Sequence, residues 1–207
     1  MNRYASPIDP REAALGGGVF LTFFGAFWAL TTLAQNPSSL TTPLSALAVG
    51  VTVALFAACV LLRRSKRHTP ATADPGAKAL KEATFWRFGA VVAIEVVAIG
   101  LANTLLLAAD HAEFIAPAVG LIVGLHFFPL AKLFREPIYH LTGGFMTMLS
   151  GVATVALLAR VTLGAPYDWS VLVGTSSALA LWITAGYVLA AQFRAAIKPG
   201  KRATGRE

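Results

Sequence analysis

The sequence predicts an all-α, polytopic membrane protein, with six transmembrane helices in a single domain. Of its 207 residues, 56% are hydrophobic and only 13% are charged, whereas a soluble domain carries about 25% charged residues. The apolar residues form continuous runs of about 20 residues, the length that an α-helix needs to cross a bilayer. A transmembrane β-barrel would instead need short segments that alternate apolar and polar residues, so this class is excluded.

The first two predicted spans cover residues 15–34 and 44–62. A cleaved signal peptide is the alternative for the first. Its apolar run is longer than the ~7–15 residues typical of such signals, so we predict a retained helix. Residues 63–84 are rich in basic residues, proline and glycine, and are predicted to form a basic cytoplasmic loop. An interfacial helix over residues 76–84 is the alternative for the end of this loop.

The remaining spans are predicted over residues 85–109, 114–134, 138–159 and 169–193, followed by a basic tail at 194–207. With the N-terminus in the cytoplasm, every lysine and arginine except Arg160 falls on the cytoplasmic side. This asymmetry is the positive-inside pattern of multi-pass proteins. We therefore expect cytoplasmic N- and C-termini and a location in the inner (plasma) membrane.

Two ionisable residues lie deep inside predicted spans. Glu95 is about 15 Å and His126 about 12 Å from the cytoplasmic ends of their helices, at 1.5 Å per residue. The short acidic turn between these helices makes them antiparallel neighbours, so the two side chains share one depth. A Glu–His hydrogen bond would satisfy both groups, and buried ionisable residues in membranes often mark ion or proton routes. The alternative is that both residues only hold helices together.

The residues around His126 predict an irregular, closely packed helix. Pro129 removes a backbone donor and is expected to kink the helix near the histidine. Gly120 and Gly124 allow a second helix to approach closely, either within the chain or across a homo-oligomer. Asn103, about 12 Å beyond Glu95 along the preceding helix, is predicted to extend the polar site outward.

Hydroxyl groups recur in the last two spans. They either bond to their own helices and pack, or line a polar cavity; the residues considered for such a lining are Thr147, Ser150, Thr154 and Tyr187.

A cationic cluster follows the second span. These side chains either only set the topology or also bind anionic lipid headgroups; they are Arg63, Arg64, Lys66 and Arg67. In a membrane protein the basic residues beside the spans set the orientation of the helices, which accounts for the net charge of +7. No nucleic-acid partner is therefore expected.

No metal site and no cofactor is expected. The chain has one cysteine, Cys59, and His126 is the only histidine inside a predicted span, so neither a zinc site nor a bis-histidine haem site can be assembled.

The stretch from Gly124 to Lys132, Gly-Leu-His-Phe-Phe-Pro-Leu-Ala-Lys, with a tyrosine at the start of the next span, resembles small uncharacterised bacterial integral membrane proteins. The matching residues are Leu125, His126, Phe127, Pro129, Leu130, Ala131 and Tyr139. The resemblance covers about a quarter of the chain and implies no activity.

Three functions remain open from the sequence. The first is a small transporter or channel-like protein with Glu95 and His126 as its polar site, for which proton coupling is one option. The second is a non-catalytic membrane subunit or partner-binding protein in which this pair is structural. The third is a membrane-embedded enzyme, ranked last because no nucleophile–base set is visible and the protein is not expected to be an enzyme.

Overall fold

The computed structural model describes residues 10–64, 75–163 and 168–197. These residues form six long helices and one short 3₁₀ turn, without a strand in the described ranges. The helices are α1 (Pro10–Gln35), α2 (Thr41–Arg64), α3 (Pro75–Ala108), α4 (Ile115–Phe134), α5 (Ile138–Leu158) and α6 (Trp169–Ile197), with η1 (Ala112–Phe114) before α4. All six are long and apolar enough to cross a membrane, which confirms the predicted all-α, six-span class.

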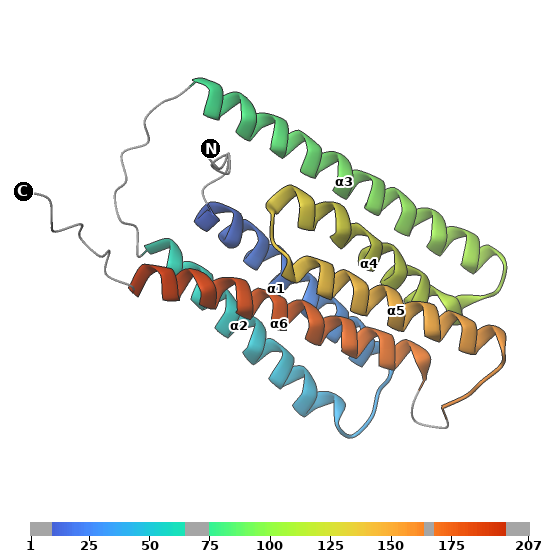
Figure 1. Cartoon of the computed structure of the whole chain (residues 1–207). Coiled ribbons are helices and arrows are strands. Elements are labelled where there is room, and N and C mark those ends of the chain that lie inside the picture. Colours follow the sequence, from blue (N-terminus) through green and yellow to red (C-terminus); the bar gives the residue numbers. More distant parts are fainter. Residues whose placement is uncertain (1–9, 65–74, 164–167, 198–207) are drawn as a thin grey trace, which may run out of the picture.

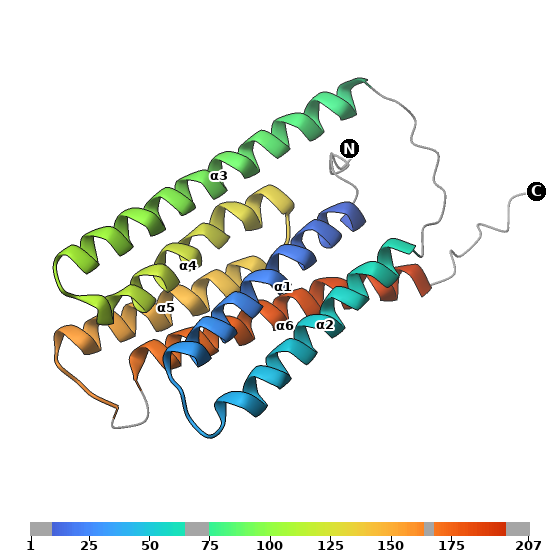
Figure 2. The ribbon, with the colours of Figure 1, turned by 180° about the vertical axis from the view of Figure 1, so that it is seen from behind.

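The helices run side by side, and successive helices alternate in direction (Figures 1 and 2). Helices α1, α4, α5 and α6 form the centre, where α1 packs mainly on α6 and α4 mainly on α5. Helix α2 packs on α1 and α6, whereas α3 packs mainly on α4 and lies at the opposite edge of the bundle (Figure 1). The bundle therefore has a four-helix centre flanked by two peripheral helices.

The two ends of the bundle differ in charge. We call the end that carries Arg64, Lys132 and Arg194 the basic end. The turns at the other end carry Asp110, Glu113 and Asp168, and we call it the acidic end although Arg160 also lies there. These two ends correspond to the cytoplasmic and outer sides expected from the charge pattern.

One helix departs clearly from its predicted bounds. Helix α3 begins at Pro75 and continues without a break into the span, so residues 75–84 belong to a 34-residue helix rather than to a loop. Proline is favoured in the first turn because it has no N–H to leave unbonded. The alanines, lysines, leucine and glutamate that follow have high helix propensity, and no glycine or proline interrupts them after Gly76. The interfacial helix weighed for residues 76–84 is thus the first part of α3.

Three helices end on residues with positive φ that are not glycine: Asp110 (59°), Arg135 (56°) and Arg160 (55°). In each case the next residue donates its N–H back five residues, to Leu106, Ala131 and Ala156 respectively. This is the hydrogen bonding of a Schellman motif, which satisfies carbonyl groups at a helix end. It lets α3, α4 and α5 stop sharply enough for short connections.

Helices α4 and α5 approach closely at glycines. A Cβ atom added to Gly124 would lie 2.6 Å from Thr147 Oγ1 and 2.7 Å from Thr147 N. A Cβ added to Gly143 would lie 2.7 Å from the Gly124 carbonyl oxygen, and Gly120 faces Ser150 in the same way. Gly120 and Gly124 therefore serve a contact within the chain.

We expect Gly124→Ala to destabilise the fold by about 1–3 kcal/mol, because the new methyl group meets backbone that cannot move aside cheaply. Thermal unfolding of the purified protein in detergent measures this change. Gly144→Ala is the matched control, since a Cβ there meets nothing within 4 Å. Equal melting temperatures for the two variants would contradict the close packing of α4 on α5.

Candidate functional site

Glu95 of α3 and His126 of α4 meet inside the bundle. His126 Nδ1 lies 3.2 Å from Glu95 Oε2, and the two side chains are only 4% and 6% exposed. The short connection through η1 places the two residues at one depth, as their distances from the turn predicted. Equal depth left the rotation of the helices open, and the structure turns both side chains inward.

The two ring nitrogens of His126 differ in their surroundings. Nδ1 faces the carboxylate of Glu95 on α3. The Nε2 atom is buried and has no hydrogen-bond partner among the described residues. An ionised carboxylate can only accept a hydrogen bond, so beside ionised Glu95 the ring proton lies on Nδ1. Nε2 is then left as a free acceptor in apolar surroundings, where an unmade bond costs about 1–3 kcal/mol.

Pro129 lies inside α4 on the basic side of the histidine. The helix continues through it from Ile115–Phe134. Proline has no N–H, so it cannot bond to the carbonyl of Leu125, next to His126. The turn that holds the histidine thus lacks one of its usual backbone hydrogen bonds.

A single face of α3 points into the bundle. Its members recur every three or four residues, as expected of one face of a helix; they are Thr84, Phe88, Val91, Glu95, Ile99 and Asn103. Along the described part of α3 over residues 82–108, Thr84 and Glu95 are the only fully buried side chains. Glu95 is therefore the most firmly enclosed residue in the middle of this helix.

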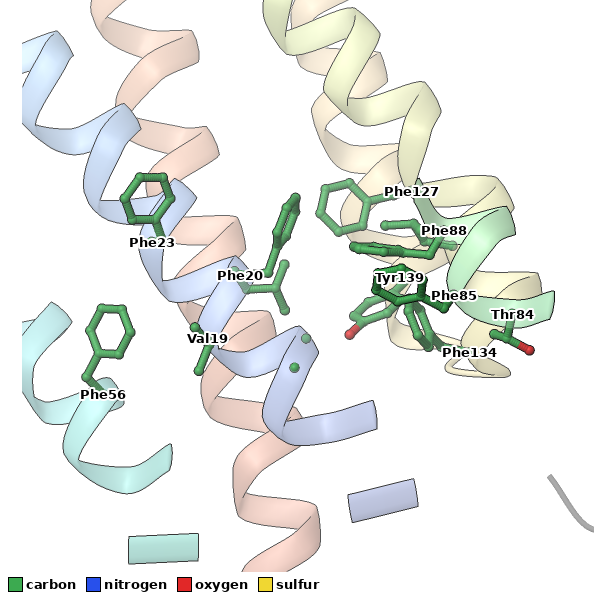
Figure 3. Close-up of a pocket in the computed structure, with 14 residues that line it drawn as sticks. Val19, Phe20, Phe23, Phe56, Thr84, Phe85, Phe88, Phe127, Phe134 and Tyr139 are labelled. Atoms are coloured by element: carbon green, nitrogen blue, oxygen red, sulfur yellow. The ribbon is translucent and has the colours of Figure 1, made fainter. Parts of the chain in front are cut away.

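The inner face of α3 borders a first cavity toward the basic end. This cavity has a volume of about 550 Å³ and lies between α1 and α2 on one side and α3, α4 and α5 on the other (Figure 3). Aromatic rings dominate its lining, and Phe88 touches both Phe20 and Phe134 at centroid distances of 6.1 and 5.8 Å. We call it the aromatic cavity.

A second cavity lies toward the acidic end. It has a volume of about 400 Å³ and is bounded by α1, α3, α4 and the start of α6. Unlike the aromatic cavity, it is lined partly by uncharged polar residues, and we call it the polar cavity; its polar members are Thr31, Thr32, Gln35, Asn36, Asn103 and Ser170. The Oδ1 atom of Asn103 is buried and has no hydrogen-bond partner.

Glu95 and His126 lie between these cavities along the chain. On α3, Phe88 lines the aromatic cavity and Ile99 the polar one, about 10 Å before and 6 Å after Glu95 at 1.5 Å per residue. On α4, Phe127 and Val123 line the two cavities on either side of His126. On α1, Phe20 lines the aromatic cavity and Phe24 the polar one, and their rings touch at a centroid distance of 4.4 Å. Neither Glu95 nor His126 lines either cavity. The buried pair thus lies, with these aromatic rings, in the packed region between the two cavities, which we call the partition.

The four hydroxyl residues considered for a cavity lining lie away from both cavities. Thr147 and Ser150 face the glycines of α4, and Thr154 bonds to the carbonyl of Ser150 on its own helix. Tyr187 is 57% exposed on the outer surface of α6. None of the four lines the aromatic or the polar cavity. These residues pack helices together or face outward.

The expected headgroup residues are only partly described. Arg63 and Arg64 end α2 and are exposed at the basic end. Lys66 and Arg67 fall outside the described residues.

Sequence reasoning missed most of the polar cavity. Several of its residues come from the end of α1 and the residue after it, where Thr31, Thr32, Gln35 and Asn36 recur at helical spacing. That spacing was a usable signal, because polar residues so placed share one face. It also missed the 2.6 Å hydrogen bond between Thr142 of α5 and Thr184 of α6, which the sequence alone gives no means of pairing.

We expect Glu95 and His126 to show energetic coupling in a double-mutant cycle. Glu95→Gln, His126→Gln and the double variant should give a coupling of about 1 kcal/mol, within the range measured for hydrogen bonds between membrane helices. Thermal or denaturant unfolding in detergent measures it.

His111 and Glu113 provide the matched control. They form the same kind of contact, Nδ1 to Oε1 at 3.1 Å, but both side chains are exposed at the acidic end. The same two substitutions there should be nearly additive, because water screens an exposed pair. Strict additivity at Glu95 and His126 as well would show that their contact stabilises nothing.

Comparisons with known proteins give no relative. The chain matches no protein-family model, and searches of curated proteins and of solved structures return no match. Any function must therefore be inferred from the geometry of the buried pair and the two cavities.

Proposed function

We propose that the chain is a small, proton-coupled transporter or channel-like protein, in which the Glu95–His126 pair carries the proton across the partition. The observation that supports this proposal is the placement of a buried ionisable pair between two cavities on the inner face of α3. We place the protein in the inner membrane of a bacterial cell, with the basic end and both termini in the cytoplasm, as the positive-inside pattern favours.

The energetics of burial support a role beyond packing. A charged residue at the centre of a transmembrane helix costs at least about 2.5–3.5 kcal/mol on insertion scales. Glu95 contacts His126, and the Nε2 atom of that histidine leaves a hydrogen bond unmade. Apolar residues at both positions would avoid these costs. Selection for stability alone would not favour this arrangement.

The chemistry of the pair suits reversible proton binding. Nε2 can accept a proton, and the resulting imidazolium would be stabilised by the Glu95 carboxylate bonded to Nδ1. Histidine suits this task because its ordinary pKa, about 6.5, lies near neutrality. In the proposed cycle the proton enters from one cavity, stays on the pair, and leaves toward the other when α3 shifts against α4.

The alternative, a non-catalytic subunit or partner-binding protein with a structural pair, is favoured by one observation. Glu95 and His126 bond to each other, and Glu95 is the only fully buried side chain in the middle of α3. In this alternative the pair fixes the register of α3 against α4 and moves no proton.

Proton flux into vesicles separates the two functions. The full chain is reconstituted into liposomes that contain a pH-sensitive dye, and a pH step is applied with the membrane potential clamped. We expect flux above that of protein-free vesicles, lowered roughly tenfold or more by Glu95→Gln and by His126→Gln. Glu113→Gln, a carboxylate substitution at the exposed acidic turn, is the matched control and should leave the flux unchanged.

Two results would contradict the proposal. One is a wild-type protein that conducts no more than empty vesicles. The other is normal flux in both variants. A loss of thermal stability in the variants without any wild-type flux would support the structural alternative.

A further inference from the structure

We propose that the aromatic cavity is a binding site for one acyl chain of a bilayer phospholipid, whose phosphate group lies at the basic end. This inference is independent of proton transport, because neither Glu95 nor His126 lines the aromatic cavity. It rests on the lining of the cavity, its opening toward the surrounding lipid, and the charges beside that opening.

The lining fits an apolar chain and no polar ligand. Of the residues that border the cavity, only Thr84 and Tyr139 carry a polar side-chain group. A polar molecule inside would leave its hydrogen bonds unmade, and water also avoids cavities of this kind. A cavity of about 550 Å³ falls within the size range of ligand-binding sites, and leaving it empty would forfeit dispersion contacts along its walls.

The cavity opens toward the hydrocarbon of the bilayer. Val19, Phe23 and Phe85 line it and yet are 42%, 57% and 69% exposed, so they form its rim on the outer surface. The rim lies between α1 on one side and α3 on the other (Figure 3). In a membrane, the molecules in contact with such a rim are lipid acyl chains. Phe127, Leu130 and Tyr139 form the floor and are almost completely buried.

Glycine keeps the rim open on α1. A Cβ atom added to Gly16 would meet nothing within 4 Å, so the space beside this residue is free. Gly17, one residue on, makes room for the hydroxyl group of Tyr139. Side chains at these positions would narrow the cavity from the α1 side.

The position of the cavity along the bundle indicates where the headgroup of a bound lipid would lie. Thr84 and Phe85, and Phe134 on α4, place one end of the cavity near the basic end. Two exposed cations lie at this level of the bundle, Arg87 next to Phe88 on α3 and Lys132 two residues after Leu130 on α4, and neither of them lines the cavity. A phosphate at this level would be attracted to both, whereas the acyl chain would extend inward along the aromatic rings.

A photoreactive phospholipid tests the proposal on the whole protein. The chain is reconstituted with a small fraction of phosphatidylglycerol that carries a diazirine in one acyl chain, and labelled residues are mapped by mass spectrometry. We expect label on the floor residues Phe127, Leu130 and Tyr139. Gly16→Phe, which fills the opening, should lower this floor labelling roughly fivefold relative to labelling of the outward-facing Leu141 and Val155.

Controls separate occupancy from misfolding. Gly50→Phe places the same side chain on an exposed glycine of α2 that also has free space around it and does not line the cavity, so floor labelling should stay at the wild-type level. Val19→Trp provides a second way to block the rim if Gly16→Phe lowers the melting temperature.

Two outcomes would overturn the inference. One is labelling confined to outward-facing residues in the wild-type protein. The other is floor labelling by a small apolar photoprobe but not by the phospholipid, which would assign the cavity to a free apolar molecule. Neither outcome depends on whether the protein conducts protons.

Discussion

The contact between Glu95 and His126 is the interaction on which the placement of α3 depends. Within a bilayer, apolar side chains gain little by leaving lipid for another helix, because lipid tails are equally apolar. Packing and polar contacts must therefore specify which face of a helix turns inward. In the described part of α3 over residues 82–108, the two fully buried side chains are Thr84 and Glu95, and both are polar. A carboxylate that must find a partner fixes the rotation of a helix that hydrophobic burial would leave undefined.

The rest of the bundle is held in a different way. Helices α4 and α5 meet at glycines whose neighbours leave no space for a methyl group, and α5 and α6 share the Thr142–Thr184 hydrogen bond. This close packing makes the four-helix centre stiff. Helix α3 contacts mainly α4, and two cavities separate it from the rest of the centre. The bundle thus combines a closely packed centre with a loosely packed edge helix, and the proposed transport would require such an element that can move against a fixed one.

How much the sequence could predict follows from these same interactions. The six spans were predictable because length and apolar composition are dictated by the bilayer. The shared depth of Glu95 and His126 was predictable because a short turn leaves antiparallel helices little freedom to slide. Their facing each other was not, since lipid-facing and helix-facing surfaces are both apolar and give no periodic signal. For the same reason the sequence could not show that Tyr187, considered for a cavity lining, is exposed on the outer surface. The start of α3 was hidden in a polar stretch whose helix propensity the apolar count ignores.

The two cavities differ in polarity, and this difference bears on the direction of the proposed proton movement. The polar cavity offers amide and hydroxyl groups, including the unpartnered Asn103 Oδ1, and can hold water near Ile99, one turn from Glu95. The aromatic cavity offers almost no polar groups and would stay dry or hold an acyl chain. In the proposed cycle, water would therefore bring a proton toward the pair from the acidic end. Release toward the basic end would require Phe20 and Phe88 to separate, and hence α3 to move away from α1. A lipid chain between these helices would resist their collapse onto each other while leaving them free to slide, since a liquid chain has no fixed shape.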